Sequence, residues 1–202
     1  MVTPADPGDR AKAERRKQIL EAAKLVFADA GYHGASINAI IERAQIARGT
    51  FYLYFESKSA VFDSILDQAL ADLRSRIRRI SVDEASAHPQ LQLREQVYKT
   101  LDYIVRDRPL AILLLSAGHT PDAEAAERLD QFYAEVRDLL RRAFETGIEI
   151  GLLRQCHPEL CAAAMLGMIR GVIELLVRQG SAANVDEVVS EVLMVALRGV
   201  LK

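Results

Sequence analysis

Apolar residues recur along most of the chain at the three- and four-residue spacing of one helical face. In the first clear stretch they occupy positions i, i+3, i+4, i+7 and i+8 of a buried stripe. These residues are Ile19, Ala22, Ala23, Val26 and Phe27. No segment shows the strict alternation of apolar and polar residues that is typical of a half-buried β-strand. We therefore predict an all-α protein of about nine helices.

Residues that start or stop helices divide this pattern into separate elements. Gly31 is a candidate helix stop, and Ser36 and Ser57 are candidate N-caps of the second and fourth helices. The fifth helix must end before Pro109, and a loop at 81–89 separates it from the long helix that follows Ser57. The pattern thus predicts three short helices followed by a larger helical body.

The composition fits a soluble globular chain. Half of the 202 residues are hydrophobic and 27% are charged, which is enough to bury a sizeable core. The net charge is −2, so the chain as a whole shows no basic signal for nucleic acid. Residues 1–60 hold nine Lys/Arg against seven Asp/Glu, whereas residues 61–202 hold seventeen against twenty-one. This asymmetry is mild, and any assignment of a partner must rest on motifs.

Cysteine usage and hydropathy point to a cellular compartment. The two cysteines, Cys156 and Cys161, are too few for a disulfide framework and suit a reducing cytosol. The polar N-terminal segment lacks the apolar stretch of a signal peptide. The longest uninterrupted nonpolar run, 160–169, has ten residues, whereas a membrane-spanning helix needs about 20. We therefore expect a cytoplasmic protein with no membrane partner.

The second and third short helices have the spacing of a helix-turn-helix, with a tight turn at Gln45–Ile46. A recognition helix must be exposed on one side and held by its partner helix on the other. The residues expected to form this holding core are Ile40, Ile41, Ile46, Phe51 and Phe55. The unit therefore predicts binding to double-stranded DNA.

The residues expected on the outer side of the third helix suit a DNA surface. They are Arg48, Gly49, Thr50, Tyr52 and Tyr54. A guanidinium can pair with a guanine edge, a glycine allows close approach, and hydroxyls can contact phosphate oxygens. Lys58 starts the next helix, where its charge and the terminal N–H groups would together hold a phosphate. Without further information, Arg48 and Lys58 could also be ordinary solvated charges.

Residues 36–66 resemble the DNA-binding signature of the TetR family of bacterial one-component regulators. Their sequence is SINAIIERAQIARGTFYLYFESKSAVFDSIL. The family pattern has a threonine or serine at the start of the second helix, then a turn, then T-x-Y-x-(H or Y)-F-x-x-K. The residues that match it are Ser36, Thr50, Tyr52, Tyr54, Phe55 and Lys58.

The resemblance implies roles for these residues and a division of the chain. Arg48 and Thr50 would read base edges, and the residues that position phosphates would be Ser36, Tyr52, Tyr54 and Lys58. The implied domains are a flexible arm at 1–10, the helix-turn-helix DNA-binding domain at 11–57, and a helical effector-binding and dimerisation domain at 58–202.

Three residues depart from the family pattern. Gln45 stands where the turn glycine is usual, so a left-handed backbone there would cost about 1 kcal/mol. Ala47 replaces the serine or threonine that usually caps the recognition helix, at a similar cost of about 1 kcal/mol. Tyr54 replaces the commoner histidine, which keeps a hydroxyl but removes a possible positive charge.

The resemblance implies a homodimer built from the last two helices, and the sequence supports it. The stretch 160–177 is apolar around almost its whole circumference, so it must be buried on all sides. The residues expected at the dimer interface are Gly167, Gly171, Val188, Val192 and Val195. The two glycines could instead fill a crowded monomer core.

In family terms a ligand pocket would lie among the fourth to eighth helices. Candidate lining residues are Tyr103, Leu113, Leu114, Phe132, Tyr133, Met165 and Met168, each of which could also be plain core. Their character favours a small apolar or amphipathic effector, such as a long-chain acyl compound, an aromatic or a drug. Arg170 and Glu174 lie one turn apart in an apolar helix and could pair, contact a partner subunit or read a polar ligand group.

The expected function is that of a ligand-responsive repressor that binds a palindromic operator as a homodimer. No catalytic motif, no cofactor motif and no Glu-x-x-His metal pair occurs in the sequence, which argues against an enzyme. A metal site at 156–161 is conceivable, but His157-Pro158-Glu159 is more simply a helix start. The remaining alternative is a helical protein–protein adaptor without DNA binding.

Overall fold

A computed structural model of the chain describes residues 7–78, 80–81, 86–116, 122–179 and 185–198. Within these ranges the chain forms nine helices and no β-strand, so the predicted all-α fold is confirmed. The helices are α1 (Pro7–Gly34), α2 (Ile37–Ala44), α3 (Arg48–Tyr52), α4 (Lys58–Arg76), α5 (Pro89–Arg106), α6 (Arg108–Leu115), α7 (Ala123–Glu149), α8 (Pro158–Gln179) and α9 (Val185–Arg198).

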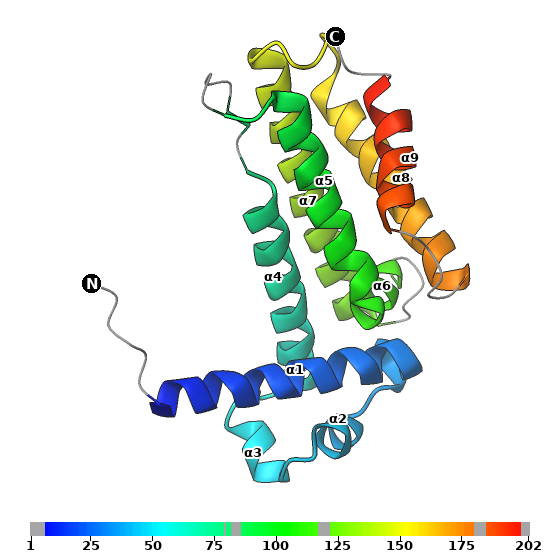
Figure 1. The fold of residues 1–202 in the computed structure, drawn as a ribbon. Coiled ribbons are helices and arrows are strands. Elements are labelled where there is room, and N and C mark those ends of the chain that lie inside the picture. Colours follow the sequence, from blue (N-terminus) through cyan, green and yellow to red (C-terminus); the bar gives the residue numbers. More distant parts are fainter. Residues whose placement is uncertain (1–6, 79, 82–85, 117–121, 180–184, 199–202) are drawn as a thin grey trace.

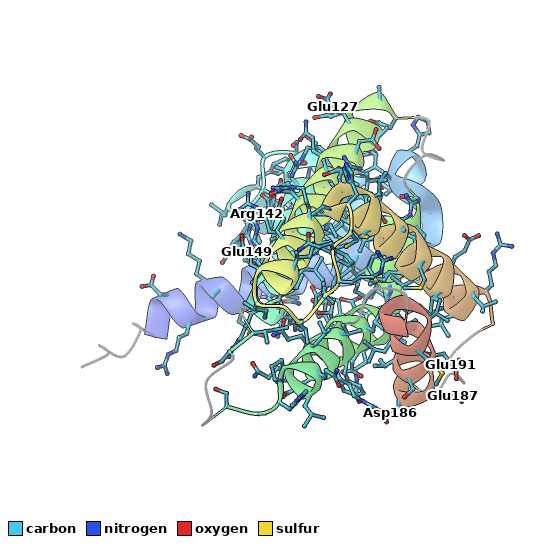
Figure 2. All side chains as sticks on the ribbon, turned by 90° about the horizontal axis from the view of Figure 1, so that it is seen from above. Glu127, Arg142, Glu149, Asp186, Glu187 and Glu191 are labelled. Atoms are coloured by element: carbon cyan, nitrogen blue, oxygen red, sulfur yellow. The ribbon has the colours of Figure 1, made fainter. Side chains whose placement is uncertain are left out.

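The helices form a small unit and a larger body (Figure 1). Helices α1, α2 and α3 lie together at one end, and α4 rises from them to run beside α5 and α7. Helix α6 lies between the foot of this body and α1. Helices α8 and α9 pack on the side of the body away from α4. Seen from above, Glu127, Arg142 and Glu149 mark the solvated side of α7, while Asp186 and Glu187 mark that of α9 (Figure 2).

One hydrophobic core runs through both parts of the molecule. Phe27 and Phe51 from the small unit belong to the same cluster of buried residues as Leu110 and Phe132 from the body. Helix α4 joins them, because Phe62 and its apolar neighbours are buried in this cluster. A continuous close-packed core transmits displacement, so the small unit and the body are mechanically linked.

The first helix begins earlier than predicted. It starts at Pro7, so residues 7–10 of the predicted arm are its first residues. Gly31 breaks the helix with φ 70° and ψ 166°, and one further turn follows to Gly34. The predicted break at Gly31 is therefore confirmed, and a glycine adopts this positive φ at no steric cost.

A polar contact fixes the small unit to the body. Lys24 of α1 is 9% exposed, and its ammonium donates a hydrogen bond to the carboxylate of Asp107 and pairs with Glu21 at 2.9 Å. Asp107 also caps α6, because its other oxygen accepts the backbone N–H of Leu110 at 3.1 Å. One carboxylate thus joins the middle of α1 to the start of α6.

Ion pairs also tie α4 to α7. Arg128 of α7 donates to Asp63 at 2.7 Å and to Asp67 at 3.1 Å, both on α4. Further along, Arg74 of α4 donates to Glu135 of α7 at 2.6 Å. These contacts hold the connecting helix along its length and keep it aligned with the body.

Helix α8 is apolar over a longer stretch than its uninterrupted nonpolar run indicates. The uninterrupted run ends at Ile169, because Arg170 follows it. Over Pro158–Arg178, however, the helix is long and apolar enough to cross a membrane by length and composition alone. Few of its residues are buried inside the protomer, although one side of it packs on α7. An exposed apolar helix of this length needs a covering surface.

The turn between α2 and α3 has the strain that the sequence predicts. Gln45 has φ 51° and ψ 48°, and it is the one non-glycine residue of the described chain with positive φ. Its N–H bonds the carbonyls of Glu42 and Ile41, which closes α2. Ala47, at the N-cap of α3, makes no side-chain capping bond. Both departures from the family pattern therefore have their expected structural effect.

We predict that Gln45→Gly raises the free energy of unfolding by about 0.5–1 kcal/mol, because glycine adopts positive φ without a Cβ clash. Denaturant unfolding of the two proteins measures the difference. The matched control is Gln131→Gly, at an exposed position inside α7, which should lower the same quantity by about 1 kcal/mol. Equal destabilisation by both variants would contradict a strained turn.

Candidate nucleic-acid interface

The holding core predicted for the helix-turn-helix is present. Ile40, Phe51 and Phe55 are almost fully buried, and Ile41 and Ile46 pack against the same cluster. Ser36 caps α2, since its hydroxyl accepts the backbone N–H of Ala39 at 3.1 Å. These contacts fix α3 on its inner side and leave its outer side free.

The outer side of α3 presents Arg48, Gly49 and Tyr52. All three are exposed, and the guanidinium of Arg48 lies 6.0 Å from the ring centre of Tyr52. No atom lies within 4 Å of the position that a Cβ on Gly49 would occupy, so a DNA backbone could approach closely there. Thr50 and Tyr54 are half-buried, and Tyr54 packs against the core. The surface therefore combines the guanidinium of Arg48, the hydroxyl of Tyr52 and an open space beside Gly49.

Leu53 belongs to this surface and was not among the predicted contacts. It directly follows α3 and is 78% exposed, the largest value among the exposed large apolar residues of the described chain. An apolar side chain at a DNA surface can contact the methyl group of thymine. The sequence contains a signal for this exposure. Leu53 lies between Tyr52 and Tyr54, and the buried positions of this segment are already taken by Phe51 and Phe55.

Lys58 has a structural role that the sequence did not reveal. Its ammonium donates hydrogen bonds to the carbonyl oxygens of Tyr32 at 2.8 Å and Ala35 at 3.2 Å. It also lies 4.2 Å from the centre of the Tyr32 ring. Burial raises the pKa of Tyr32 to about 12, so this ring stays neutral beside the cation. The side chain thus joins the end of α1 to the start of α4.

The exposed part of α1 adds positive charge beside α3. Arg15 and Lys17 are exposed, while Arg16 donates to the hydroxyl of Ser64 at 3.0 Å and its guanidinium lies 5.1 Å from the Phe55 ring centre. Such charges attract the phosphate backbone whatever the base sequence. The small unit therefore has the charge and the shape of a DNA-binding surface.

The body contains an apolar cavity of about 130 Å³ between the end of α4 and helices α5, α7, α8 and α9. Its polar lining residues are Gln96 and Thr100, and the rest are apolar. The apolar lining consists of Ile77, Leu93, Val97, Leu101, Leu140, Ala143, Phe144, Leu153, Met165, Ile169, Val192 and Leu193. A cavity of this character selects for an apolar chain or ring.

Of the predicted ligand-binding residues, Met165 lines this cavity and the others lie elsewhere. Leu113, Leu114 and Phe132 are buried in the main core. Met168 packs against a second cluster formed with α9. Sequence periodicity identifies such residues as apolar and inward, but it cannot separate a packed core from the wall of a cavity.

The two predicted tyrosines make polar contacts outside the cavity. The Tyr133 hydroxyl donates to the carbonyl of Leu114 at 2.9 Å. The Tyr103 hydroxyl donates to Asp72 at 3.2 Å, and burial raises its pKa well above its ordinary value. Tyr103 lies in an open groove of about 1,100 Å³ between α1, α4 and α5, whose lining includes many charged side chains. Because several of these charges pair with one another, this groove is less suited to an apolar ligand than the cavity.

The alternatives left open for Arg170 and Glu174 are partly resolved. The guanidinium of Arg170 lies 4.5 Å from the ring centre of Tyr133, a cation–π contact between α8 and α7. Glu174 accepts a hydrogen bond from Arg178 at 2.6 Å. The two residues therefore have different partners. Among the described residues no cluster of three or more His, Cys, Asp or Glu is arranged to hold a metal ion.

Comparisons with known proteins agree with this geometry. Residues 19–65 match the family model described as bacterial regulatory proteins, tetR family, and residues 86–200 match the model of a tetracyclin repressor-like C-terminal domain. The HTH-type transcriptional repressor KstR of Rhodococcus jostii is 32% identical over 182 residues, which cover 89% of this chain and 81% of that protein.

Two solved structures share the fold. The transcriptional regulator FadR from Bacillus subtilis in complex with stearoyl-CoA has a TM-score of 0.72 and 22% identity, covering 91% of this chain and 98% of that one. The SmeT–triclosan complex, from the repressor of a Stenotrophomonas maltophilia multidrug efflux pump, has a TM-score of 0.74 and 21% identity, covering 94% and 92%.

Lys58 and Arg48 should differ in their effect on stability. We predict that Lys58→Ala lowers the free energy of unfolding by about 1–3 kcal/mol, because the carbonyls of Tyr32 and Ala35 lose their charged donor. Arg48→Ala should change it by less than about 0.5 kcal/mol, because the residue is exposed. Chemical unfolding of both variants measures this, and a stability loss confined to Arg48→Ala would contradict the assignment.

Proposed function

The chain belongs to the TetR family of bacterial regulatory proteins, and from this premise we propose that it is a repressor which binds a palindromic operator as a homodimer and is released by an apolar effector. It is a DNA-binding transcriptional regulator and its relatives are not enzymes. The observation that carries the proposal is the outer side of α3, where Arg48, Gly49 and Tyr52 are exposed over a rigid core.

The proposed contacts follow from this surface. Arg48 and Thr50 read base edges, with Gly49 allowing close approach, and Ser36, Tyr52 and Tyr54 position phosphates. The main chain of Lys58 would contact phosphate at the start of α4, since its ammonium is already held by α1. Of the predicted arm at 1–10, residues 7–10 are helical and the rest lies outside the described residues. The proposed DNA-binding domain is 11–57 and the effector and dimerisation domain is 58–202.

A homodimer is supported by the uncovered side of α8. A stripe of exposed, mostly small or apolar residues follows this helix at three- and four-residue spacing. Its members are Leu160, Ala163, Ala164, Gly167, Gly171 and Leu175. No atom lies within 4 Å of a Cβ built on Gly167 or Gly171, so a second helix can approach closely there. A copy of the same stripe about a two-fold axis would cover it.

Helix α9 contributes unevenly to this surface. Val195 is 68% exposed and Met194 is 43% exposed, so both side chains are open to a partner. Val192 is buried and lines the cavity of the protomer, and Val188 is half-buried against the second cluster. The proposed interface therefore keeps Gly167, Gly171 and Val195 of the predicted set. It omits Val188 and Val192, because both side chains pack inside the protomer.

An apolar effector is supported by the cavity between α4, α5, α7, α8 and α9. The solved complexes of two relatives by fold hold stearoyl-CoA and triclosan, which are respectively an acyl thioester and an aromatic. The cavity of this chain, at about 130 Å³, is smaller than the roughly 300–1,000 Å³ of typical ligand pockets. Binding a long chain would therefore push its helices apart.

This expansion can be linked to DNA through the packed core. A ligand that favours the expanded body shifts the population toward a dimer whose recognition helices no longer match two half-sites about 34 Å apart. Helix α6 and α4 carry the change, because Asp107 joins α6 to Lys24 and Arg128 joins α7 to α4. By linkage, operator DNA weakens effector binding by the same factor. We also propose that the protein is cytoplasmic, where its operator lies.

Selection from a random-sequence DNA library tests the function. We predict a palindromic consensus whose affinity falls steeply as salt rises, because phosphate contacts release counterions. Arg48→Ala should weaken binding to the consensus by about tenfold or more, whereas Arg142→Ala, on the remote side of α7, should stay within about twofold. No enrichment by a folded dimer would support the alternative of a protein–protein adaptor.

The oligomeric state tests the α8 interface. We predict that Ala164→Glu converts the dimer to a monomer at micromolar concentration, because it places a charge in an apolar interface. Ala134→Glu makes the same change at an exposed position of α7 and should remain dimeric. Sedimentation velocity separates the two states. A dimer that survives Ala164→Glu would show that α8 is covered by something else.

A further inference from the structure

The start of α8 is built around two thiols. His157 occupies the N-cap position, since its carbonyl accepts the backbone N–H of Cys161 at 3.0 Å and the helix begins at Pro158. Cys156 therefore precedes the cap, and Cys161 lies four residues after it. At these two positions apolar side chains commonly pack together across the first turn, which fixes how the chain enters the helix.

Both thiols are free, half-buried and packed in one small cluster. They lie against Phe144, Leu153 and Ala162, which are buried. Burial raises the pKa of Cys161, and the neighbouring Cys156 thiol raises it further. A pair of apolar residues would fill this space equally well, so the packing alone does not require sulfur.

The chain between α7 and α8 is held at its other end by α7. The backbone N–H groups of Leu152 and Leu153 both donate to the carbonyl of Gly147, at 2.9 and 3.0 Å. A Cβ on Gly147 would lie 2.6 Å from the Leu153 side chain, so this side chain is seated directly on the helix. The connection is thus fixed to α7 by Leu153 and to α8 by the two cysteines.

This connection forms part of the cavity wall. Phe144, Leu153 and Met165 belong both to the cluster around the thiols and to the lining of the apolar cavity. A change in the distance between Cys156 and Cys161 therefore moves residues that line the cavity. It also moves the first turn of α8, where Leu160 starts the exposed apolar stripe.

We propose that Cys156 and Cys161 form a reversible disulfide under hydroperoxides and that this bond is a second input to the regulator. In reducing compartments, disulfides of this kind are transient and sense oxidants. The bond draws the start of α8 toward the α7–α8 connection and restrains the cavity wall. The disulfide itself is independent of the function proposed above, whereas its effect on operator binding rests on that function.

The reaction is a two-electron oxidation by a hydroperoxide. The Cys156 thiolate attacks one peroxide oxygen, the O–O bond breaks, and water or an alcohol leaves after protonation, giving a sulfenic acid. The Cys161 sulfur then attacks Cys156 Sγ, the S–S bond forms, the S–O bond breaks, and a second water leaves with the Cys161 proton. The same disulfide forms whichever of the two cysteines is oxidised first. A dithiol reductant reverses the bond.

Intact-mass analysis of the full chain tests the bond. After reduction, treatment with stoichiometric hydrogen peroxide and alkylation, the wild type should lose about 2 Da and accept no alkyl group, whereas the reduced protein accepts one on each cysteine. Cys156→Ala and Cys161→Ala should instead gain oxygen or form intermolecular disulfides. If the wild type keeps two alkylatable thiols, or is oxidised in the same way as the single variants, the proposal is overturned.

Hydrogen exchange and DNA binding then test the consequence. The disulfide should slow amide exchange over 150–162, and this slowing should be lost on reduction and absent in Cys156→Ala. Operator affinity of the oxidised and reduced wild type should differ by about fivefold or more, with no difference in the double alanine variant. A disulfide with unchanged affinity would overturn the role as an input. If the reduced protein binds no selected DNA, the proposed function fails, while mass and exchange still decide the disulfide.

Discussion

The burial of α4 is the constraint on which the rest of the structure depends. Its apolar face enters the same continuous core as α1, α3, α6 and α7, so no surface separates the small unit from the body. Burying one large apolar side chain stabilises a fold by about 1.5–3 kcal/mol, and α4 buries several, including Phe62, Ile65 and Leu66. Any displacement of α4 must therefore be shared between the recognition helix and the cavity wall.

Polar contacts at two places also join the small unit to the body. Asp107 caps α6 and is also the partner of buried Lys24. A shift of α6 must therefore either break this charged hydrogen bond or move α1 with it. Lys58 makes a similar connection at the C-terminal end of α1, where its ammonium joins the carbonyls of Tyr32 and Ala35 to the start of α4. Charged hydrogen bonds in partly buried places are costly to leave unmade. The small unit therefore follows the body as a rigid piece.

The uncovered side of α8 is the opposite case. Within one protomer the apolar side chains of Leu160 and Leu175 are exposed to water, and the space beside Gly167 is open. In the proposed homodimer, the same helix of the second copy would cover this side. Because the same helix begins beside the two cysteines and lines the cavity, the proposed dimerisation, effector binding and thiol chemistry would all act on one element.

Much of this fold can be predicted from sequence signals that act between neighbouring residues. Helical periodicity, the caps at Ser36 and Ser57, and the glycine at 31 act over a few residues, so the element order and the helix-turn-helix were correctly predicted. The resemblance to the TetR signature was confirmed over the same segment. The position of Gln45, where the family usually has a glycine, also predicted the left-handed backbone that the residue adopts.

Tertiary structure alone decided which residues share a partner. Periodicity shows that Leu113, Phe132 and Met165 face inward, but only packing of five helices shows that Met165 lines the cavity. The bonds of Lys58 to Tyr32 and of Lys24 to Asp107 join residues far apart in the chain, and no local pattern marks them. The sequence determined the helices and their faces, because those depend on short-range geometry. The cavity, the hydrogen bonds of Lys24 and Lys58, and the uncovered side of α8 depend on where distant helices meet.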